Sequence, residues 1–460
     1  MRKFTKIASL TAASVMAVSS LVGCGGGTES ELKEVQVWSH NSHSKAFMNE
    51  KVDEFNKGKG KDLGVKLVYT VKESDIQQAA EMAYASDQGP DFISQIDIEK
   101  NRTIGKIMSF EDIEGGKEWI ESTYSPEMYD RALFKGNDGK VYTLPFNVIT
   151  YGIVYNKDMF KKYGIVDENG EPTPPETFEE VREYAKRMTN PKEDDYGIIL
   201  PEKWGAFVSA DILQVLNSST GMGVFNCVEG KYDFNGLKPI LEMYCGMMED
   251  GSVFPGGESL DNDMARAYFA ERNIGMKLAG SYDVGVFNTQ FKAKCDWGVA
   301  PYPVADKNNK YKQFMTAGGG YAMSAKAVEK FGDKACLEIL KFLYGDELNK
   351  ASYENGYGIP YKASITEGAS VADNLKNWDA FSALADISTG GYDAAGSDLT
   401  GQRNEKQVIM EDVFTGNVSI DDAIADLNNR YNAGMKTYYE NNPDKDFNAL
   451  IKKDWNTKLN

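Results

Sequence analysis

The chain has 460 residues, of which 42% are apolar, 26% charged and 12% aromatic. This balance is that of an ordinary globular protein, and it excludes a polytopic membrane protein, a collagen-like chain and a disulfide-dense miniprotein. The length predicts two or three domains. The 69 acidic and 51 basic residues give a net charge of −18, which argues against binding nucleic acid or an anionic membrane through a broad basic patch.

The start of the chain predicts export followed by attachment to a lipid. An apolar stretch, residues 7–22, follows a basic start and is shorter than the roughly 20 residues of a membrane-spanning helix. It ends in Leu21-Val22-Gly23-Cys24, which resembles a bacterial lipobox, so residues 1–23 are expected to be a lipoprotein signal peptide and Cys24 to be acylated. Residues 24–33 begin with glycines and are expected to form a flexible tether. The folded part then stays in water at the outer face of the cytoplasmic membrane, anchored only through Cys24.

Strand and helix signals alternate along the rest of the chain, which predicts an α/β protein with mainly parallel sheets flanked by helices. The expected strands are 35–38, 65–71, 91–96, 141–144, 151–155, 196–200, 274–278, 297–300 and 321–324. Helices are expected at 44–57, at 74–86, after Pro174-Pro175 and at 419–432. The third helix has capping-box spacing from Thr177 to Glu180, and Gly434 is expected to stop the last one.

Motifs for covalent chemistry are scarce. Gly221-Met222-Gly223 begins like a dinucleotide-binding loop, but Asn226 stands where the third glycine belongs, and no nucleophile elbow occurs. The two histidines, His40 and His43, could share a helix face, yet two ligands are too few for a metal site. We expect no catalytic residue, no cofactor and no metal, although counting carboxylates does not exclude a glycosidase or lyase pair.

Four cysteines follow Cys24 in the sequence. They are Cys227, Cys245, Cys295 and Cys336. No spacing typical of a metal site links them, and export permits disulfides, so they are interpreted as buried small hydrophobic residues or as one incidental disulfide. The sequence leaves their redox state open.

The segment Trp38-Ser39-His40-Asn41 lies at the carboxyl end of the first expected strand. Ligands of open parallel sheets sit just beyond this end, so the segment is a candidate binding element. Trp38 fits either stacking on a ligand or packing in the core. A second interpretation of the loop is that Ser42, His43 or Ser44 caps the following helix.

Several segments together resemble a known family. They are 89–93, 139–147, 151–165, 174–178, 275–282, 297–303, 318–324 and 355–360. In this order they are similar to family 1 extracellular solute-binding proteins, the sugar-binding lipoproteins of ABC importers that are related to maltose-binding protein. The resemblance implies a monomer with two α/β lobes joined by crossing strands and a ligand cleft between them, which closes by a hinge motion. It places lobe one at 34–146 plus 297–345 and lobe two at 147–296 plus 346–460.

The resemblance also implies contacts to a sugar, which needs an aromatic plate under its ring and planar polar groups around its hydroxyls. The expected plates are Trp204 and Tyr282; at Tyr282 the family more often has Trp. The other expected contacts are Trp38, Ser39, His40, Asn41, Asp97, Asn147, Tyr151, Ser281, Asp283, Gly319, Gly320 and Arg403. Core packing of the two aromatics, a helix cap at Asp97 and a plain tight turn at 318–320 are the competing interpretations.

The expected function is capture of a carbohydrate, most simply an oligosaccharide, and its delivery to the transmembrane subunits of an ABC permease. A different solute, such as a polyol, glycerol phosphate or an iron chelate, is an alternative, and the negative charge argues weakly against a phosphorylated one. Two further alternatives are a surface lipoprotein enzyme that acts on glycans and a sensory subunit that presents bound sugar to a membrane kinase. The sequence does not identify the sugar.

Overall fold

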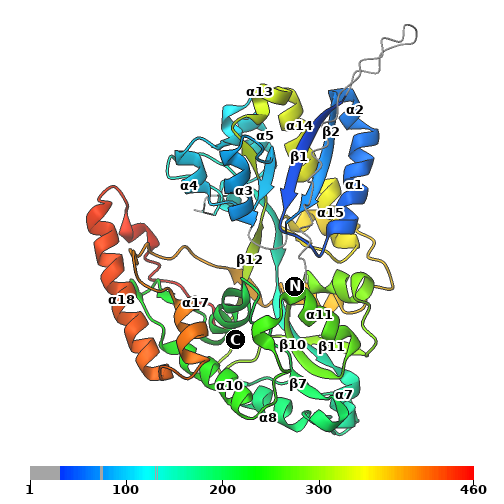
Figure 1. Cartoon of the computed structure of the whole chain (residues 1–460), viewed down its shortest axis with the longest axis vertical. Coiled ribbons are helices and arrows are strands. Elements are labelled where there is room, and N and C mark those ends of the chain that lie inside the picture. Colours follow the sequence, from blue (N-terminus) through cyan, green and yellow to red (C-terminus); the bar gives the residue numbers. More distant parts are fainter. Residues whose placement is uncertain (1–31, 73–75, 130, 132, 460) are drawn as a thin grey trace, which may run out of the picture.

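The computed structural model describes residues 32–72, 76–129, 131 and 133–459. Cys24 and most of the expected tether lie outside the described residues. Figure 1 shows two parts, one above the other, each with a sheet between helices. We call them lobe one, which contains β1, and lobe two, which contains β10. Among the described residues, no helix combines the length and apolar character needed to cross a membrane.

Lobe one is built on a mixed sheet with strand order β2-β1-β3-β13-β4. The strands are β1 (Lys33–Ser39), β2 (Val65–Val71), β3 (Phe92–Ser94), β4 (Ile107–Met108) and β13 (Tyr321–Ser324). The helices are α1 (Lys45–Lys57), α2 (Lys59–Leu63), α3 (Ile76–Ala85), α4 (Ile98–Thr103), α5 (Gly116–Thr123), α6 (Pro126–Tyr129), α13 (Ala327–Phe331), α14 (Asp333–Leu343) and α15 (Asp346–Glu354). β1 is parallel to β2 and β3, whereas β13 is antiparallel to β3 and β4. Alternate residues of β1, such as Val35 and Val37, are fully buried in the core.

Lobe two is built on a sheet with strand order β11-β6-β10-β7. The strands are β6 (Tyr151–Asn156), β7 (Tyr196–Ile198), β10 (Ile274–Gly280) and β11 (Trp297–Ala300), with a separate hairpin of β8 (Phe225–Asn226) and β9 (Lys231–Tyr232). The α-helices are α7 (Lys157–Lys162), α8 (Phe178–Arg187), α9 (Gln214–Thr220), α10 (Lys238–Glu249), α11 (Asn262–Glu271), α12 (Asp283–Gly285), α16 (Trp378–Ala383), α17 (Glu405–Val408) and α18 (Ile420–Asn441). Three π-helical segments are η3 (Val208–Leu213), η6 (Val286–Gln290) and η8 (Ile409–Val413). All seven residues of β10 are buried, because helices cover both faces of this strand.

The remaining short helices of the described chain are 3₁₀ helices. They are η1 (Phe110–Asp112), η2 (Pro191–Glu193), η4 (Asn235–Leu237), η5 (Gly257–Ser259), η7 (Ala363–Thr366) and η9 (Phe447–Leu450).

A third sheet connects the lobes, with strand order β14-β5-β12-β15. Its strands are β5 (Pro145–Ile149), β12 (Gln313–Gly319), β14 (Ile359–Pro360) and β15 (Ser388–Gly390). Only Thr150 separates β5 from β6, and only Gly320 separates β12 from β13, so both strands lead directly from one lobe to the other (Figure 1). A motion between the lobes must therefore bend these strands.

The α/β class is confirmed, and most predicted elements exist. The strand at 65–71 has the predicted bounds, and the helix after Pro174-Pro175 has the predicted capping box from Thr177 to Glu180. The expected strand at 141–144 is wrong: Val141 makes an isolated bridge to Lys135, and β5 begins at Pro145. In isolation, these apolar residues match a strand, but they fill the lobe-one core as loop.

The predominance of parallel pairing is not found. β6 is antiparallel to β10 and β11, and β7 alone runs parallel to β10. The reason is topological, since β6 continues a strand that arrives from the other lobe instead of returning through a helical crossover. Because β11 pairs in lobe two and α15 packs near α1, we propose that the lobe boundaries lie at β12 and after α15 instead of at residues 297 and 346.

The expected stop of the last helix at Gly434 is also wrong. α18 continues through Gly434 to Asn441. The carbonyl of Gly434 accepts the N–H of Asp398 at 3.0 Å, and a β-carbon at 434 would lie 2.5 Å from the Asp398 carbonyl oxygen. The glycine therefore permits close packing of a neighbouring segment on a continuous helix.

Candidate functional site

The loop after β1 contacts lobe two. The Ser42 hydroxyl donates to Oδ2 of Asp263, in the first turn of α11, at 3.2 Å. The ring of His43 lies 5.5 Å from that of Tyr282, which follows β10. These contacts join segments distant in sequence at the carboxyl ends of β1 and β10. We call Ser42, His43, Asp263, Arg266 and Tyr282 the interlobe junction.

Arg266 organises the lobe-two side of the junction. Its Nε donates to Oδ1 of Asp283 and its Nη1 to Oδ1 of Asp263, each at 2.5 Å. Its guanidinium lies 5.3 Å from the ring centroid of Tyr282, within the range of a cation–π contact. Burial alone would lower the pKa of Arg266, but the charges of Asp283 and other neighbours raise it, so the residue stays charged. One arginine thus positions two carboxylates and an aromatic ring.

Two further ionisable groups, Lys277 and Asp211, lie buried near Arg266 and Asp283. The amine of Lys277, in β10, donates to the carbonyl of Leu278 at 2.8 Å. Burial lowers the pKa of Lys277, although the negative charges of Asp283 and Asp211 act to raise it. Burial raises the pKa of Asp211, in η3, to about 7, although Lys277 opposes this. Oδ2 of Asp211 is buried without a hydrogen-bond partner among the described residues. Such an acceptor is costly unless a hydroxyl or water meets it.

The predicted residues after β1 form hydrogen bonds within lobe one. Ser39 is fully buried, and its Oγ accepts the N–H of Asn41 at 3.1 Å. The backbone N–H of His40 donates to Oγ of Ser94 at 3.0 Å, and its Nδ1 lies 2.8 Å from the same oxygen. Burial lowers the pKa of His40 to about 4, and burial followed by the charge of Arg266 lowers that of His43 to about 3. Both imidazoles are therefore neutral at neutral pH.

Two other predicted residues of lobe one are engaged locally. Lys72 places its ammonium 4.6 Å from the ring centroid of Trp38, which packs at the edge of a buried cluster. Asp97 is exposed and caps α4, because its Oδ1 accepts the N–H of Lys100 at 2.9 Å. The capping interpretation therefore describes Asp97. The corresponding interpretation for the loop before α1, in which Ser42, His43 or Ser44 caps the helix, is not met by a side-chain bond, because the N-cap residue Ser44 makes none.

The predicted residues at the crossing strands have different environments. Asn147, in β5, pairs with Gly318 of β12 and Pro360 of β14. Tyr151 is buried in lobe two, and its hydroxyl lies 2.7 Å from Oγ1 of Thr316 in β12. Burial raises the pKa of this phenol to about 12. Tyr151 therefore joins a lobe core to a connecting strand.

The two glycines predicted near the ligand lie at the end of β12 and directly after it. Gly319 lies where the β12–β5 register shifts. A β-carbon at Gly320 would clash with the ring and hydroxyl of Tyr344.

Four predicted residues of lobe two are placed as follows. Ser281 is buried and its N–H donates to the carbonyl of Thr150 at 2.9 Å. Trp204 is partly buried against the lobe-two core. Asp283 has one oxygen on Arg266, while the other accepts the N–H of Gly280 at 3.3 Å, so both oxygens have protein donors. Arg403 forms an ion pair with Asp412 and donates from Nη1 at 2.9 Å.

The sequence reasoning missed Ser42, Asp263, Arg266 and Lys277 as site residues, and it considered His43 only as a cap or metal ligand. Lys277 alone gave a usable signal, because a lysine inside an otherwise apolar strand needs a buried partner. Asp263 and Arg266 look like an ordinary exposed helix pair until α11 is placed against the end of β10.

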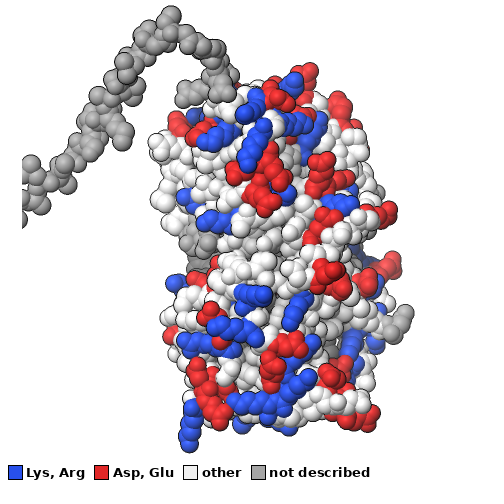
Figure 2. All heavy atoms as spheres, turned by 90° about the vertical axis from the view of Figure 1, so that its right-hand side faces the viewer, with Lys and Arg blue, Asp and Glu red and all other residues white. Residues whose placement is uncertain are grey.

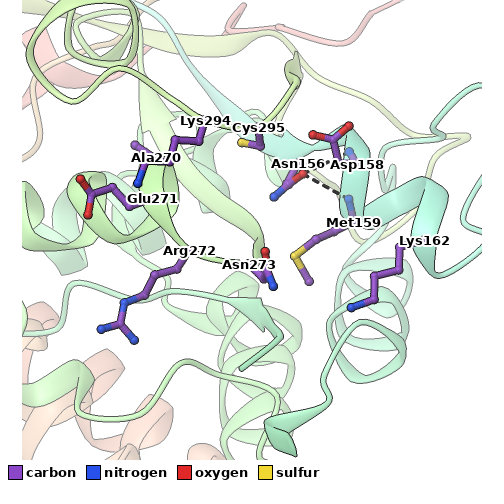
Figure 3. A pocket seen from close by; sticks show the side chains of 10 residues that line it. All are labelled: Asn156, Asp158, Met159, Lys162, Ala270, Glu271, Arg272, Asn273, Lys294 and Cys295. Carbon is purple, nitrogen blue, oxygen red and sulfur yellow. Dashed lines mark hydrogen bonds between the residues drawn. The ribbon is translucent and has the colours of Figure 1, made fainter. Parts of the chain in front are cut away.

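A hollow of about 250 Å³ lies elsewhere on lobe two (Figure 3). It is lined by Asn156, Asp158, Met159, Lys162, Ala270, Glu271, Arg272, Asn273, Lys294 and Cys295. The side chain of Asn156 caps α7 by accepting the N–H groups of Asp158 and Met159, and Lys162 pairs with Asp195. These polar groups stabilise the fold, and no predicted site residue lines this hollow.

Other chemistry is limited among the residues that the structure describes. The four cysteines named above are free, and no cluster of three or more potential ligands could hold a metal ion within the described ranges. On the face in Figure 2, acidic and basic side chains are interspersed over both lobes. Arg266 of the junction differs from these surface charges, since it is buried and paired with Asp263 and Asp283.

Comparison with known proteins identifies the family. Residues 39–350 match the family described as bacterial extracellular solute-binding protein. The chain belongs to this family. This family consists of extracytoplasmic solute-binding proteins and is non-enzymatic.

Two curated relatives illustrate the range of solutes. The chain is 26% identical over 259 residues to a maltotriose-binding protein of Pyrococcus abyssi. This aligned region covers 54% of this chain and 49% of the relative. The chain is 28% identical over 192 residues to the sn-glycerol-3-phosphate-binding periplasmic protein UgpB of Brucella suis, which covers 40% and 42%. The chain spans about half the length of the curated relatives it matches.

Solved structures share the fold over nearly the whole described chain. The maltose/maltodextrin-binding domain MalE of Bdellovibrio bacteriovorus, bound to maltotriose, has a TM-score of 0.64 at 17% identity and covers 88% of this chain and 100% of its own. The GacH receptor of Streptomyces glaucescens has a TM-score of 0.67 at 19% identity and covers 88% and 99%. At these identities the similarity establishes the MalE-like fold alone.

Proposed function

We propose that this solute-binding protein serves an ABC importer, is anchored at the outer face of the cytoplasmic membrane through Cys24, and binds a carbohydrate between its lobes. It holds the solute, closes around it and delivers it to the permease as a monomer. Its contacts with the solute come from Ser42, Asp263 and the expected residues other than Asp283, with Tyr282 and Trp204 as stacking plates.

The observation that carries this proposal is the composition of the interlobe junction. It combines the aromatic face of Tyr282 with the hydroxyl of Ser42 and the carboxylate of Asp263. A sugar needs this combination, because its ring has an apolar C–H face and a rim of hydroxyl groups. Structural neighbours bound to maltotriose, cycloalternan and stachyose support the choice of a saccharide.

A polyol is a second candidate, because neighbours bound to ribitol and D-mannitol share the fold. A phosphorylated solute is less compatible with the junction. Arg266 is already paired with two carboxylates, and Lys277 faces Asp211 and Asp283. A phosphate would have to compete with these carboxylates for both cations.

Thermal unfolding in the presence of single solutes tests the proposal. Maltotriose, stachyose, ribitol, D-mannitol and sn-glycerol 3-phosphate form the panel. A solute that binds only the native state raises the melting temperature by mass action, with about 2.7 kcal/mol gained at a hundredfold excess over Kd. A shift with a saccharide supports the proposal, whereas a shift confined to glycerol 3-phosphate, or shortened saccharide products, contradicts it.

The anchor is tested separately. Cys24→Ala should move the protein from the membrane fraction to the soluble fraction and leave solute binding unchanged, because the lipid lies outside the folded lobes. A variant that stays in the membrane after a salt wash contradicts acylation at Cys24.

A further inference from the structure

The lobes touch at the junction through their own side chains. Ser42 and Asp263 are 221 residues apart in sequence, yet they form a hydrogen bond of 3.2 Å. His43 lies over Tyr282 at 5.5 Å between ring centroids, with the rings inclined by 35°. Both contacts reach from the loop after β1 in lobe one to lobe two, where Asp263 lies in α11 and Tyr282 follows β10.

The lobe-two partners are held in place before they meet lobe one. Oδ1 of Asp263 is bound to Arg266, which leaves Oδ2 directed to Ser42. Arg266 also stacks near Tyr282 and is fixed by Asp283. Because these positions are set within lobe two, little side-chain freedom remains to be lost when Ser42 and His43 dock.

A second contact is made by Phe47, in the first turn of α1 and four residues after His43. The ring of Phe47 lies 5.3 Å from that of Tyr357. Tyr357 in turn reaches lobe two, because its hydroxyl lies 3.4 Å from Oγ1 of Thr289. The N–H of Gly285 donates to the carbonyl of Gly356 at 3.1 Å. The first turn of α1 is thus tied to the segment that follows Tyr282.

We propose that Ser42 and His43 form a latch with Asp263 and Tyr282 that keeps this side of the lobes closed without solute. In the latched state His43 covers the ring of Tyr282, so a solute must displace the imidazole to use that ring. The competition between His43 and a solute for the Tyr282 ring rests on the proposed function, whereas the latch itself does not. Latched molecules do not bind solute through this ring. The apparent Kd is therefore the intrinsic Kd divided by the fraction of molecules that are unlatched.

Small-angle scattering on solute-free protein tests the latch. The full chain is unfolded in guanidinium, dialysed and refolded to remove bound solute, and the radius of gyration is compared between wild type and the Ser42→Ala/His43→Ala double variant. Ser122→Ala is the matched control, because among the described residues its hydroxyl donates to the Trp119 carbonyl within α5, away from the junction. Circular dichroism confirms that each variant is folded.

We expect a larger radius of gyration for the double variant and an unchanged one for Ser122→Ala. Titration of a His43→Ala single variant, which keeps the Ser42 hydroxyl, with maltotriose should then show binding about threefold tighter or more than wild type, because the competing imidazole is gone. Equal radii for wild type and double variant overturn the latch. A larger radius without any maltotriose binding supports the latch and rejects maltotriose as the solute, so the two proposals fail separately.

Discussion

Arg266 and Asp283 form an ion pair enclosed by lobe two, with Nε 2.5 Å from Oδ1 and side chains that are 5% and 0% exposed. The pair explains why Asp283 differs from its predicted environment. A carboxylate that follows an aromatic plate looks like an acceptor for a solute hydroxyl, but here the buried guanidinium and the N–H of Gly280 occupy its oxygens. Asp283 instead fixes Arg266, which contacts Asp263 and Tyr282.

Asp283→Ala should destabilise the protein by about 3–5 kcal/mol, because it leaves Arg266 buried with one partner fewer. Denaturant unfolding measures the loss. Glu440→Gln is the control, since its pairing with Lys436 at 3.8 Å is exposed and should be worth about 0–1 kcal/mol. Equal midpoints for the Asp283 variant and wild type would contradict the structural role assigned to this pair.

Tyr282→Ala and Trp204→Ala should each weaken saccharide binding by about 1–3 kcal/mol if the two rings are the stacking plates. Both are partly exposed, so the melting temperature of the solute-free protein should fall only slightly. Trp297→Ala is the comparison, because Trp297 is 2% exposed and its truncation should cost about 3–5 kcal/mol of stability. A large stability loss with unchanged affinity at either ring would show packing instead of recognition.

The sequence predicted those features that depend on neighbouring residues. The alternation at 65–71 and the capping box at Thr177 are local patterns, and both appear as predicted. Strand pairing is not local, so the antiparallel insertion of β6 could not be read from residues 151–155. The same limit applies to the site. Ser39 and His40 were predicted as contacts because they follow a strand, whereas the contacts of Asp263 with Ser42 and of Arg266 with Tyr282 depend on where α11 lies in the fold.

Gly434→Ala should destabilise the protein although alanine is the better helix former. The added β-carbon would lie 2.5 Å from both the Asp398 carbonyl oxygen and the Ser397 hydroxyl, and such overpacking typically costs about 1–3 kcal/mol. Asn429→Ala, at an exposed position of the same helix, is the control and should stabilise it slightly. If the Gly434 variant gains the roughly 1 kcal/mol of helix propensity, the close packing of residues 397–398 on α18 is wrong.

The pH dependence of stability should reflect two histidines and one aspartate with opposite signs. His40 and His43 have folded pKa values of about 4 and 3, below the ordinary 6.5. Between pH 6.5 and 4.5, these two imidazoles therefore bind protons in the unfolded chain but not in the folded chain. The free energy of unfolding consequently decreases as the pH is lowered. Asp211 has a folded pKa of about 7, above its ordinary 3.8, so the folded chain binds the extra proton and stability rises as pH falls.

Each fully shifted group changes the free energy of unfolding by about 1.4 kcal/mol per pH unit, so two histidines against one aspartate leave a net loss on acidification. Denaturant unfolding between pH 6.5 and 4.5 measures the slope. Asp211→Asn should make the loss steeper, because it removes the opposing proton. His40→Gln/His43→Gln should reverse the sign, leaving a protein that becomes more stable as the pH falls through this window. Parallel slopes for wild type and both variants would mean that these groups titrate alike in the folded and unfolded chains, and that the burial assigned to them is wrong.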